Sequence, residues 1–207
     1  LGPFSYVDAR DRYQVQLIAR TVSDGGKAFY RSMIVTRKDS DIHTMVDLKG
    51  SAFAFTDPKS TSGYLFPLMG LRLNGLSRND LGEARFLKRH ANSLLAVVNG
   101  HVPAGAISST AFDKVDVDRD LLRVLWRSEP IYRGPWVARR DLPADVVRSL
   151  RAALLAISQS PEADAIFANL GTKGFVAGTD QDYDTIRQVR RLTAAGWSPA
   201  WPQICCC

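Results

Sequence analysis

The stretch SAFAFTDPKSTSGYLFP, residues 51–67, leads from a short apolar segment through a loop of hydroxyl residues into an apolar helical pattern. A strand, a loop and a helix in this order are typical of α/β proteins. The start of a helix leaves about four backbone N–H groups unpaired, and the macrodipole adds roughly half a positive charge there. The loop therefore has two interpretations, a helix cap or an anion-binding site.

Ser60, Thr61 and Ser62 supply three hydroxyl groups, and Gly63 lets the backbone approach a ligand closely. Taken alone, these residues favour capping, because Ser and Thr are common N-caps that each stabilise a helix by about 1 kcal/mol. The stretch lacks the glycine and lysine spacing of a P-loop and the Gly-x-Ser-x-Gly pattern of a nucleophile elbow.

The rest of the chain alternates between strand and helix patterns up to about residue 127, and helices dominate after it. This order predicts an α/β protein with parallel or mixed sheets. Short apolar runs predict strands at 15–19, 32–36, 52–55, 84–87, 104–108 and 122–126. Helical spacing predicts helices at 8–12, 64–74, 92–99, 141–158, 160–171 and 180–196.

The chain has a formal net charge of +6, from 27 Lys and Arg residues against 21 Asp and Glu. This balance favours anionic partners. The basic residues are interleaved with acidic ones, and the densest groups, Arg139-Arg140 and Arg187 with Arg190-Arg191, are expected to be solvated helix faces. No interleaving of aromatic and basic residues marks a stacking platform, so nucleic acid is not expected as a partner.

All three cysteines stand at Cys205–Cys207, where none can bridge the core. Their spacing does not suggest zinc, and no metal site or cofactor is predicted. A core without disulfides fits both the cytosol and the periplasm.

Two further residues are candidates for binding. His90 immediately precedes a predicted helix, where its ring N–H can donate to an anion, although a loop histidine is the simpler interpretation. Tyr30 precedes a predicted buried strand and is either an edge of the core or a hydroxyl donor in a cleft.

The order of these motifs is similar to the phosphate/phosphite/phosphonate-binding family, the substrate-binding proteins of ABC importers. The resemblance rests most specifically on DPKSTSGYLFP, residues 57–67, followed by HANSLLAV, residues 90–97. It extends over nearly the whole chain, including LGPFSYVDA at the start and RVLWRSEPI at 123–131.

The resemblance implies the type II periplasmic-binding-protein fold, an α/β fold of two lobes with the ligand cleft between them. It implies that residues 1–34 are part of lobe 1, residues 35–127 form lobe 2, and residues 128–207 are a crossover and the C-terminal helices of lobe 1. Family members carry further βαβ structure before the LGP segment, so the resemblance implies that the first lobe is N-terminally incomplete in this chain. The signal peptide would have preceded that missing part.

The resemblance also implies a function, the binding of a small phosphorus oxyanion without catalysis. The ligand would be a phosphonate, phosphite or phosphate, the partner an ABC permease in the membrane, the location periplasmic and the protein a monomer. The residues that match the family's ligand-binding positions are Tyr30, Ser60, Thr61, Ser62, Gly63 and His90.

Two positions depart from the family pattern. Aminoalkylphosphonate binders hold the ammonium group of the ligand with acidic residues, and the matching positions here are Thr110 and Gly134. An ammonium ligand would lose charge-assisted hydrogen bonds of about 1.5–3 kcal/mol each, so a small oxyanion is favoured over 2-aminoethylphosphonate. Tyr132 and Trp136, beside Gly134, are expected to fill the space that a longer ligand tail would occupy.

Two other functions remain open at this point. The same lobes serve as the sensing domain of a signalling receptor, which the sequence does not distinguish from a transport protein. An esterase with Ser62 as nucleophile and His90 as base needs a third group to orient the histidine, and the neighbours Lys88 and Arg89 do not supply it.

Overall fold

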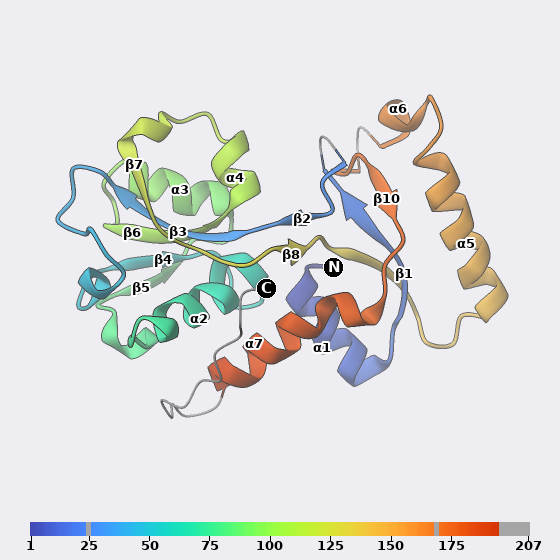
Figure 1. Ribbon diagram of the computed structural model, residues 1–207, viewed down its shortest axis with the longest axis horizontal. Coiled ribbons are helices and arrows are strands. Elements are labelled where there is room, and N and C mark those ends of the chain that lie inside the picture. The colour runs from blue at the N-terminus through green and yellow to red at the C-terminus, as the bar shows by residue number, and fades with distance from the viewer. Residues whose placement is uncertain (24–25, 168–169, 195–207) are drawn as a thin grey trace, which may run out of the picture.

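The computed structural model, which describes residues 1–23, 26–167 and 170–194, consists of two α/β lobes joined by a narrow two-stranded ribbon (Figure 1). The three terminal cysteines lie outside these residues. Within the described ranges, no helix combines the length and the apolar character needed to cross a bilayer.

The second lobe contains a mixed sheet in the order β5-β4-β6-β3-β7. Strand β4 pairs in parallel with β5 and β6, whereas β3 pairs antiparallel with β6 and β7. The mixed sheet that the sequence predicts is therefore confirmed in this lobe. The strands are β3 (Ser32–Arg37), β4 (Phe53–Phe55), β5 (Ala84–Phe86), β6 (Ala104–Ser108) and β7 (Leu122–Arg127).

Helices cover both faces of this sheet (Figure 1). Ile34 packs into the core that includes Leu71 of α2 (Phe66–Leu73), and its neighbours Met33 and Val35 pack into the core under α3 (His90–Val98). Because side chains alternate between faces and both faces are buried, the three inner strands β3, β4 and β6 are buried along nearly their whole length. This is why the sequence predicts these strands within one or two residues.

The first lobe contains an antiparallel sheet in the order β10-β1-β9. Its strands are β1 (Gln16–Val22), β9 (Pro135–Ala138) and β10 (Gly174–Val176). The sequence predicts β1 but neither of its partners, because β9 begins at a proline and β10 has three residues. The helices of this lobe are α1 (Pro3–Tyr13), α5 (Ala144–Ile157), α6 (Ala163–Phe167) and α7 (Asp184–Ala194).

The ribbon between the lobes pairs β2 (Phe29–Tyr30) with β8 (Ile131–Tyr132). Helix α7 also reaches from the first lobe toward α2 of the second (Figure 1). Neither strand of the ribbon is predicted from the sequence, because two residues are too few to show a period. Short helical elements complete the structure: η2 (Val46–Leu48), η3 (Thr61–Leu65), η4 (Arg78–Asp80), α4 (Ser109–Lys114), η5 (Arg119–Leu121) and η6 (Asp180–Tyr183).

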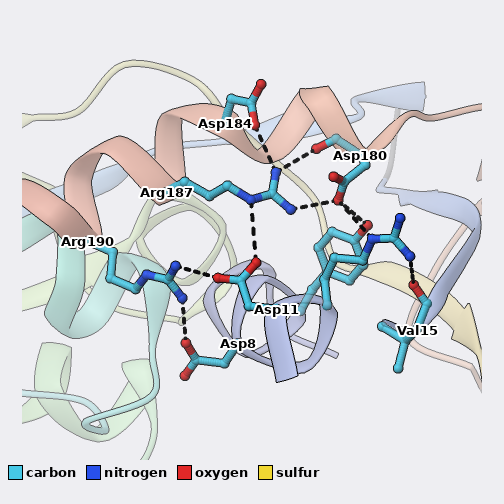
Figure 2. A network of polar contacts seen from close by, with 9 residues as sticks. Asp8, Asp11, Val15, Asp180, Asp184, Arg187 and Arg190 are labelled. Atoms are coloured by element: carbon cyan, nitrogen blue, oxygen red, sulfur yellow. Dashed lines mark hydrogen bonds and ion pairs between the residues drawn. The ribbon is translucent and has the colours of Figure 1, made fainter. Parts of the chain in front are cut away.

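Arginines of α7 bind acidic residues of α1 and η6 in a network of ion pairs (Figure 2). The Arg187 guanidinium lies 2.8 Å from both Asp180 and Asp184, and Arg190 lies 2.9 Å from Asp8. The Arg187 side chain is only 15% exposed. The expectation that Arg187 and Arg190 lie on a solvated face is therefore wrong, because α1, which is distant in the sequence, packs against α7 and brings Asp8 and Asp11 to these arginines.

The network also sets the charge of Asp180. Burial by itself raises the pKa of this carboxyl group, but hydrogen bonds from Tyr6 and Arg187 outweigh it, and the pKa lies below its ordinary value. Asp180 therefore stays ionised well below neutral pH. Its paired carboxylate stabilises the contact between α1 and α7 until the pH falls through that lowered pKa.

We expect Arg187→Gln to lower the free energy of unfolding by about 1–2 kcal/mol, because it leaves partly buried carboxylates without their cation. Arg191→Gln removes an exposed charge from the same helix and should cost less than about 0.5 kcal/mol. Urea unfolding of both variants measures the difference. Equal losses would show that the network does not stabilise the fold.

Candidate functional site

The hydroxyl-rich loop forms the wide turn η3, and Ser60 caps it. The Ser60 side chain accepts a hydrogen bond from the Gly63 N–H at 3.0 Å, and its carbonyl accepts one from the Leu65 N–H at 3.1 Å. The capping interpretation thus holds for Ser60, whose hydroxyl satisfies one of the unpaired N–H groups at the helix start.

Gly63 lies in close contact with Thr56, which follows strand β4. A Cβ atom on Gly63 would stand 2.2 Å from the Thr56 hydroxyl oxygen, and the Thr56 N–H donates to the Gly63 carbonyl at 3.0 Å. A glycine is required here because any side chain would displace Thr56. The contact fixes the turn against the end of the strand.

Thr56 in turn orients His90, the first residue of α3. The Thr56 hydroxyl lies 3.1 Å from His90 Nδ1, and the Ser62 hydroxyl lies 3.4 Å from His90 Nε2. Burial lowers the pKa of His90 to about 4. The imidazole is therefore neutral at pH 7, with one ring nitrogen as a donor and the other as an acceptor.

Tyr30 closes the group from the ribbon between the lobes. Its phenol lies next to the hydroxyl groups of Ser62 and Thr61. Burial raises the pKa of the Tyr30 phenol, and the two neighbouring hydroxyl groups only partly oppose the rise. The phenol therefore remains protonated and is able to donate.

Two further groups contact the turn. From the first lobe, the Phe4 N–H in the first turn of α1 donates to the Thr61 hydroxyl at 2.9 Å. From β3 of the second lobe, the Ser32 hydroxyl donates to the Ser62 carbonyl at 2.7 Å. Sequence reasoning missed Phe4, Ser32 and Thr56. Thr56 directly follows a predicted strand, so the local sequence pattern could have identified it. Phe4 and Ser32 are far from the turn in sequence and lie close to it only in space.

The structure thus brings Tyr30, Thr61, Ser62 and His90 together, and we call these four residues the hydroxyl–imidazole cluster. Thr61 and Ser62 are 3% and 1% exposed. The cluster combines three hydroxyl groups and one neutral imidazole, with no carboxylate among the four residues. Such a set can donate several hydrogen bonds to one oxyanion and does not repel it. Ser60 and Gly63 shape the turn that presents Thr61 and Ser62.

Thr110 and Gly134, the two positions that depart from the family pattern, contact other parts of the chain. The Thr110 hydroxyl accepts from Arg133 Nη2 at 3.0 Å, and a Cβ on Gly134 would stand 2.4 Å from the Leu1 carbonyl oxygen. The Leu1 backbone thus takes the space that a side chain at residue 134 would need.

Tyr132 and Trp136, the two aromatic residues beside Gly134, pack within the first lobe. Trp136 packs edge-on against Phe175 with 4.6 Å between ring centres. The guanidinium of Arg20 lies over the Tyr132 ring at 4.2 Å. Both partners come from the sheet of that lobe, β1 and β10.

This chain is similar to known proteins in both sequence and fold. The family described as "ABC transporter, phosphonate, periplasmic substrate-binding protein" matches residues 1–183. The chain is 32% identical to the "Phosphate-import protein PhnD" of Mycolicibacterium smegmatis, over 94% of this chain and 68% of that protein. It is 30% identical to the "Phosphonates-binding periplasmic protein" of Escherichia coli, over 91% of this chain and 58% of that protein.

A solved structure agrees with this match. A binding protein component of an ABC phosphonate transporter from Pseudomonas aeruginosa superposes with a TM-score of 0.78 at 25% identity, over 94% of this chain and 67% of that one. The chain thus spans between 58% and 68% of the length of the curated relatives that it matches.

We expect Gly63→Ala to destabilise the protein by about 1–3 kcal/mol, because the added methyl group overlaps Thr56 and nothing beside it can move cheaply. The matched control is Gly2→Ala, where the nearest atom is 4.0 Å from the new Cβ and a loss of about 0.5 kcal/mol is expected at an N-cap. Thermal or urea unfolding distinguishes the two. A Gly63→Ala variant as stable as the control would contradict the close packing.

The lowered pKa of His90 predicts a pH dependence of stability. Between pH 6.5 and about 4 the unfolded chain binds a proton at this residue that the folded chain does not, so the free energy of unfolding decreases as the pH falls through this range. Over the whole range the free energy of unfolding decreases by roughly 3 kcal/mol through this residue. The His90→Gln variant should lack this decrease, whereas His43→Gln, at an exposed histidine, should retain it.

Urea unfolding at pH 7 and pH 5 measures this contribution in the unaltered protein and both variants. The same loss of stability in the unaltered protein and in His90→Gln would show that His90 is not held neutral by burial.

Proposed function

The chain belongs to the family of periplasmic substrate-binding proteins of phosphonate ABC transporters, and from this premise we propose that it binds a small phosphorus oxyanion without catalysis and delivers it to a membrane permease. The hydroxyl–imidazole cluster carries the proposal: donors from η3, α3 and the ribbon converge on one buried point. Phosphonate, phosphite and phosphate all present the oxygens that such a set can bind.

Two features of the cluster suit a tetrahedral oxyanion. The donors approach from different sides, because Tyr30 lies on the ribbon between the lobes while Thr61, Ser62 and His90 lie in the second lobe. In the present arrangement Ser62 and His90 are bonded to each other at 3.4 Å, and Tyr30 lies next to Ser62 and Thr61. An oxyanion would exchange the neutral hydrogen bond for charge-assisted ones, which are about twice as strong.

The division into lobes supports closure around a ligand. We propose residues 1–34 as part of lobe 1, 35–127 as lobe 2, and 128–207 as the crossover and C-terminal helices of lobe 1, with the difference that β3 already enters the sheet of lobe 2 at Ser32. The ribbon of β2 and β8 is the narrow connection about which such lobes would rotate. Tyr30 lies on this ribbon, so its contacts with Thr61 and Ser62 would change with the lobe angle.

The same geometry weighs against an esterase. His90 Nδ1 faces the neutral hydroxyl of Thr56, whereas a serine nucleophile needs a histidine oriented and stabilised as imidazolium by an acidic group. A pKa of about 4 also makes His90 a weak base. Binding without chemistry is therefore the function that these residues support.

The family supports permease delivery and a periplasmic location, and we propose a monomeric state with them. The related proteins named above are transport or binding proteins, so they lend no support to the alternative of a signalling receptor. One relative carries the name of a phosphate importer and the other that of a phosphonate-binding protein. We therefore propose the shared oxyanion and not one particular compound.

Ser62→Ala and Thr61→Ala should each weaken the binding of methylphosphonate or phosphate by about 1–3 kcal/mol, because each removes a buried donor to the oxyanion. Ser149→Ala, at an exposed position of α5, is the control and should leave the affinity unchanged. Isothermal titration calorimetry gives the affinities, and urea unfolding shows whether each variant is folded. Unchanged affinity in both cluster variants would remove the cluster from the proposed site.

A further inference from the structure

Thr56, which follows β4, is held in place by both its backbone and its side chain. Its N–H donates to the Gly63 carbonyl at 3.0 Å, and its carbonyl accepts from the Lys88 N–H at 2.7 Å. Its hydroxyl oxygen occupies the room that a side chain at residue 63 would need. Thr56 is buried, with 4% of its surface exposed. The hydroxyl group is therefore held in one position.

This hydroxyl group has one proton and two neighbours. Its oxygen lies 3.3 Å from the carbonyl oxygen of Ala106 in β6 and 3.1 Å from Nδ1 of His90. A carbonyl oxygen only accepts hydrogen bonds, whereas a neutral imidazole has one donor and one acceptor. Both contacts are satisfied when the Thr56 hydroxyl donates to Ala106 and His90 Nδ1–H donates to the hydroxyl. The hydrogen bond at one ring nitrogen sets the tautomer, so the ring proton resides on Nδ1.

The other ring nitrogen, Nε2, is then an acceptor, and the Ser62 hydroxyl lies 3.4 Å from it. Ser62 has a single proton to donate. If it donates to His90, a lone pair of its own oxygen faces the ligand. If it donates to the ligand instead, Nε2 is left without a donor. In both cases the pair presents one acceptor to a bound oxyanion, and a buried acceptor without a donor is unfavourable.

Thr61 and Tyr30 differ from this pair, because each has a proton that it can donate to a ligand. The Thr61 hydroxyl accepts from the Phe4 N–H at 2.9 Å, and its own proton is not used in that bond. Burial keeps the Tyr30 phenol protonated by raising its pKa, although the guanidinium carbon of Arg133 lies 5.6 Å from the centre of its ring and opposes the rise. The site thus combines hydroxyl donors with one acceptor.

We infer that Thr56 holds His90 with its proton on Nδ1, so that the site binds a phosphorus oxyanion in its monoprotonated form and discriminates against oxyanions without a proton. The inference rests on the proposed function and names the form of the ligand that the site selects. A P–OH group of the ligand would donate to Nε2, and the Ser62 proton would then be free for another oxygen of the ligand. Thr56 is a positioning residue, because it acts on the ligand through the histidine.

This requirement separates two classes of tetrahedral anion. The singly charged forms of phosphonate, phosphite and phosphate each carry at least one P–OH group. Sulfonates and sulfate carry no proton near neutral pH. The two classes have similar shapes, so a set of donors alone would bind both, whereas a fixed acceptor distinguishes them.

The ligand keeps its proton in this arrangement. Burial lowers the pKa of His90 to about 4, with no contribution from a charged group of the described residues. The second ionisation of a phosphoryl group lies near or above about pH 6, so the ring is the weaker base. Neither His90 nor Tyr30 changes its charge between pH 6 and pH 9. The ionisable side chains of the adjoining loops are exposed: Asp57, Lys59, Lys88 and Arg89.

Methylphosphonate and methanesulfonate test the inference, because near pH 6.5 both are monoanions with a methyl tail and only the phosphonate has a hydroxyl proton. Isothermal titration calorimetry of the full chain at this pH should show methylphosphonate binding at least about tenfold more tightly. Above the second pKa of methylphosphonate, its affinity should fall by about tenfold for each pH unit as the monoanion disappears. A site of donors alone would bind the dianion more tightly.

Variants of Thr56 locate this selectivity. Thr56→Val removes the hydroxyl group and keeps the shape of the side chain, so Nδ1–H loses its acceptor and the ring can place its proton on Nε2. We expect the ratio of the methanesulfonate to the methylphosphonate dissociation constant to fall at least about fivefold and the pH dependence to flatten. Thr56→Ser keeps the hydroxyl group and should retain both properties.

Thr185→Val, at an exposed hydroxyl group of α7, is the control and should change neither the ratio nor the pH dependence. Urea unfolding shows whether each variant is folded. An unchanged ratio in a folded Thr56→Val variant would exclude Thr56 as the positioning residue.

The tautomer of His90 is measured directly in the unaltered protein. Long-range proton–nitrogen correlation spectra distinguish the two neutral tautomers of a histidine, and the spectrum of His90→Gln assigns the signals. At pH 8 we expect His90 to carry its proton on Nδ1. The exposed His43 should show the Nε2–H tautomer that free imidazole side chains favour.

The outcomes separate this inference from the proposed function. If methanesulfonate binds as tightly as methylphosphonate, if the affinity for methylphosphonate rises through its second ionisation, or if His90 carries its proton on Nε2, the acceptor is excluded while oxyanion binding stands. If neither methylphosphonate nor phosphate binds at any pH, the proposed function is wrong and the inference falls with it.

Discussion

The close approach of Gly63 to Thr56 is the constraint on which the rest of the site depends. With no side chain at residue 63, the turn η3 lies directly against the end of β4, and the Thr56 hydroxyl remains in place to meet His90. The same turn presents Thr61 and Ser62 toward Tyr30. A larger residue at 63 would move Thr56 and so disturb both the histidine and the two hydroxyl groups.

The first lobe reaches this site through a helix that ion pairs hold in place. Arg187 and Arg190 of α7 bind Asp8 and Asp11 of α1, and the first turn of α1 donates an N–H to Thr61. Stability of the lobe and geometry of the site are thereby connected. The connection is electrostatic at one end of α1 and a single backbone hydrogen bond at the other.

The hydroxyl–imidazole cluster at the lobe boundary is neutral, because burial lowers the pKa of His90 to about 4 and raises that of Tyr30. Its neutral donors select oxygen atoms by direction and distance.

The sequence by itself determined the α/β class and the strands of the second lobe, and it predicted the four residues of the hydroxyl–imidazole cluster. Buried strands such as Ser32–Arg37 are apolar runs, and the turn at 60–63 and the helix after His90 carry local start signals that need no tertiary contact. The resemblance that these motifs carry led to the family. Only the tertiary structure decided the pairing of the two-residue strands, the burial of Arg187, the contact of Thr56 with His90 and the place of Arg133 beside Tyr30. Each of these joins segments that are far apart along the chain, and local pattern contains no signal for a contact whose partner lies elsewhere in the sequence.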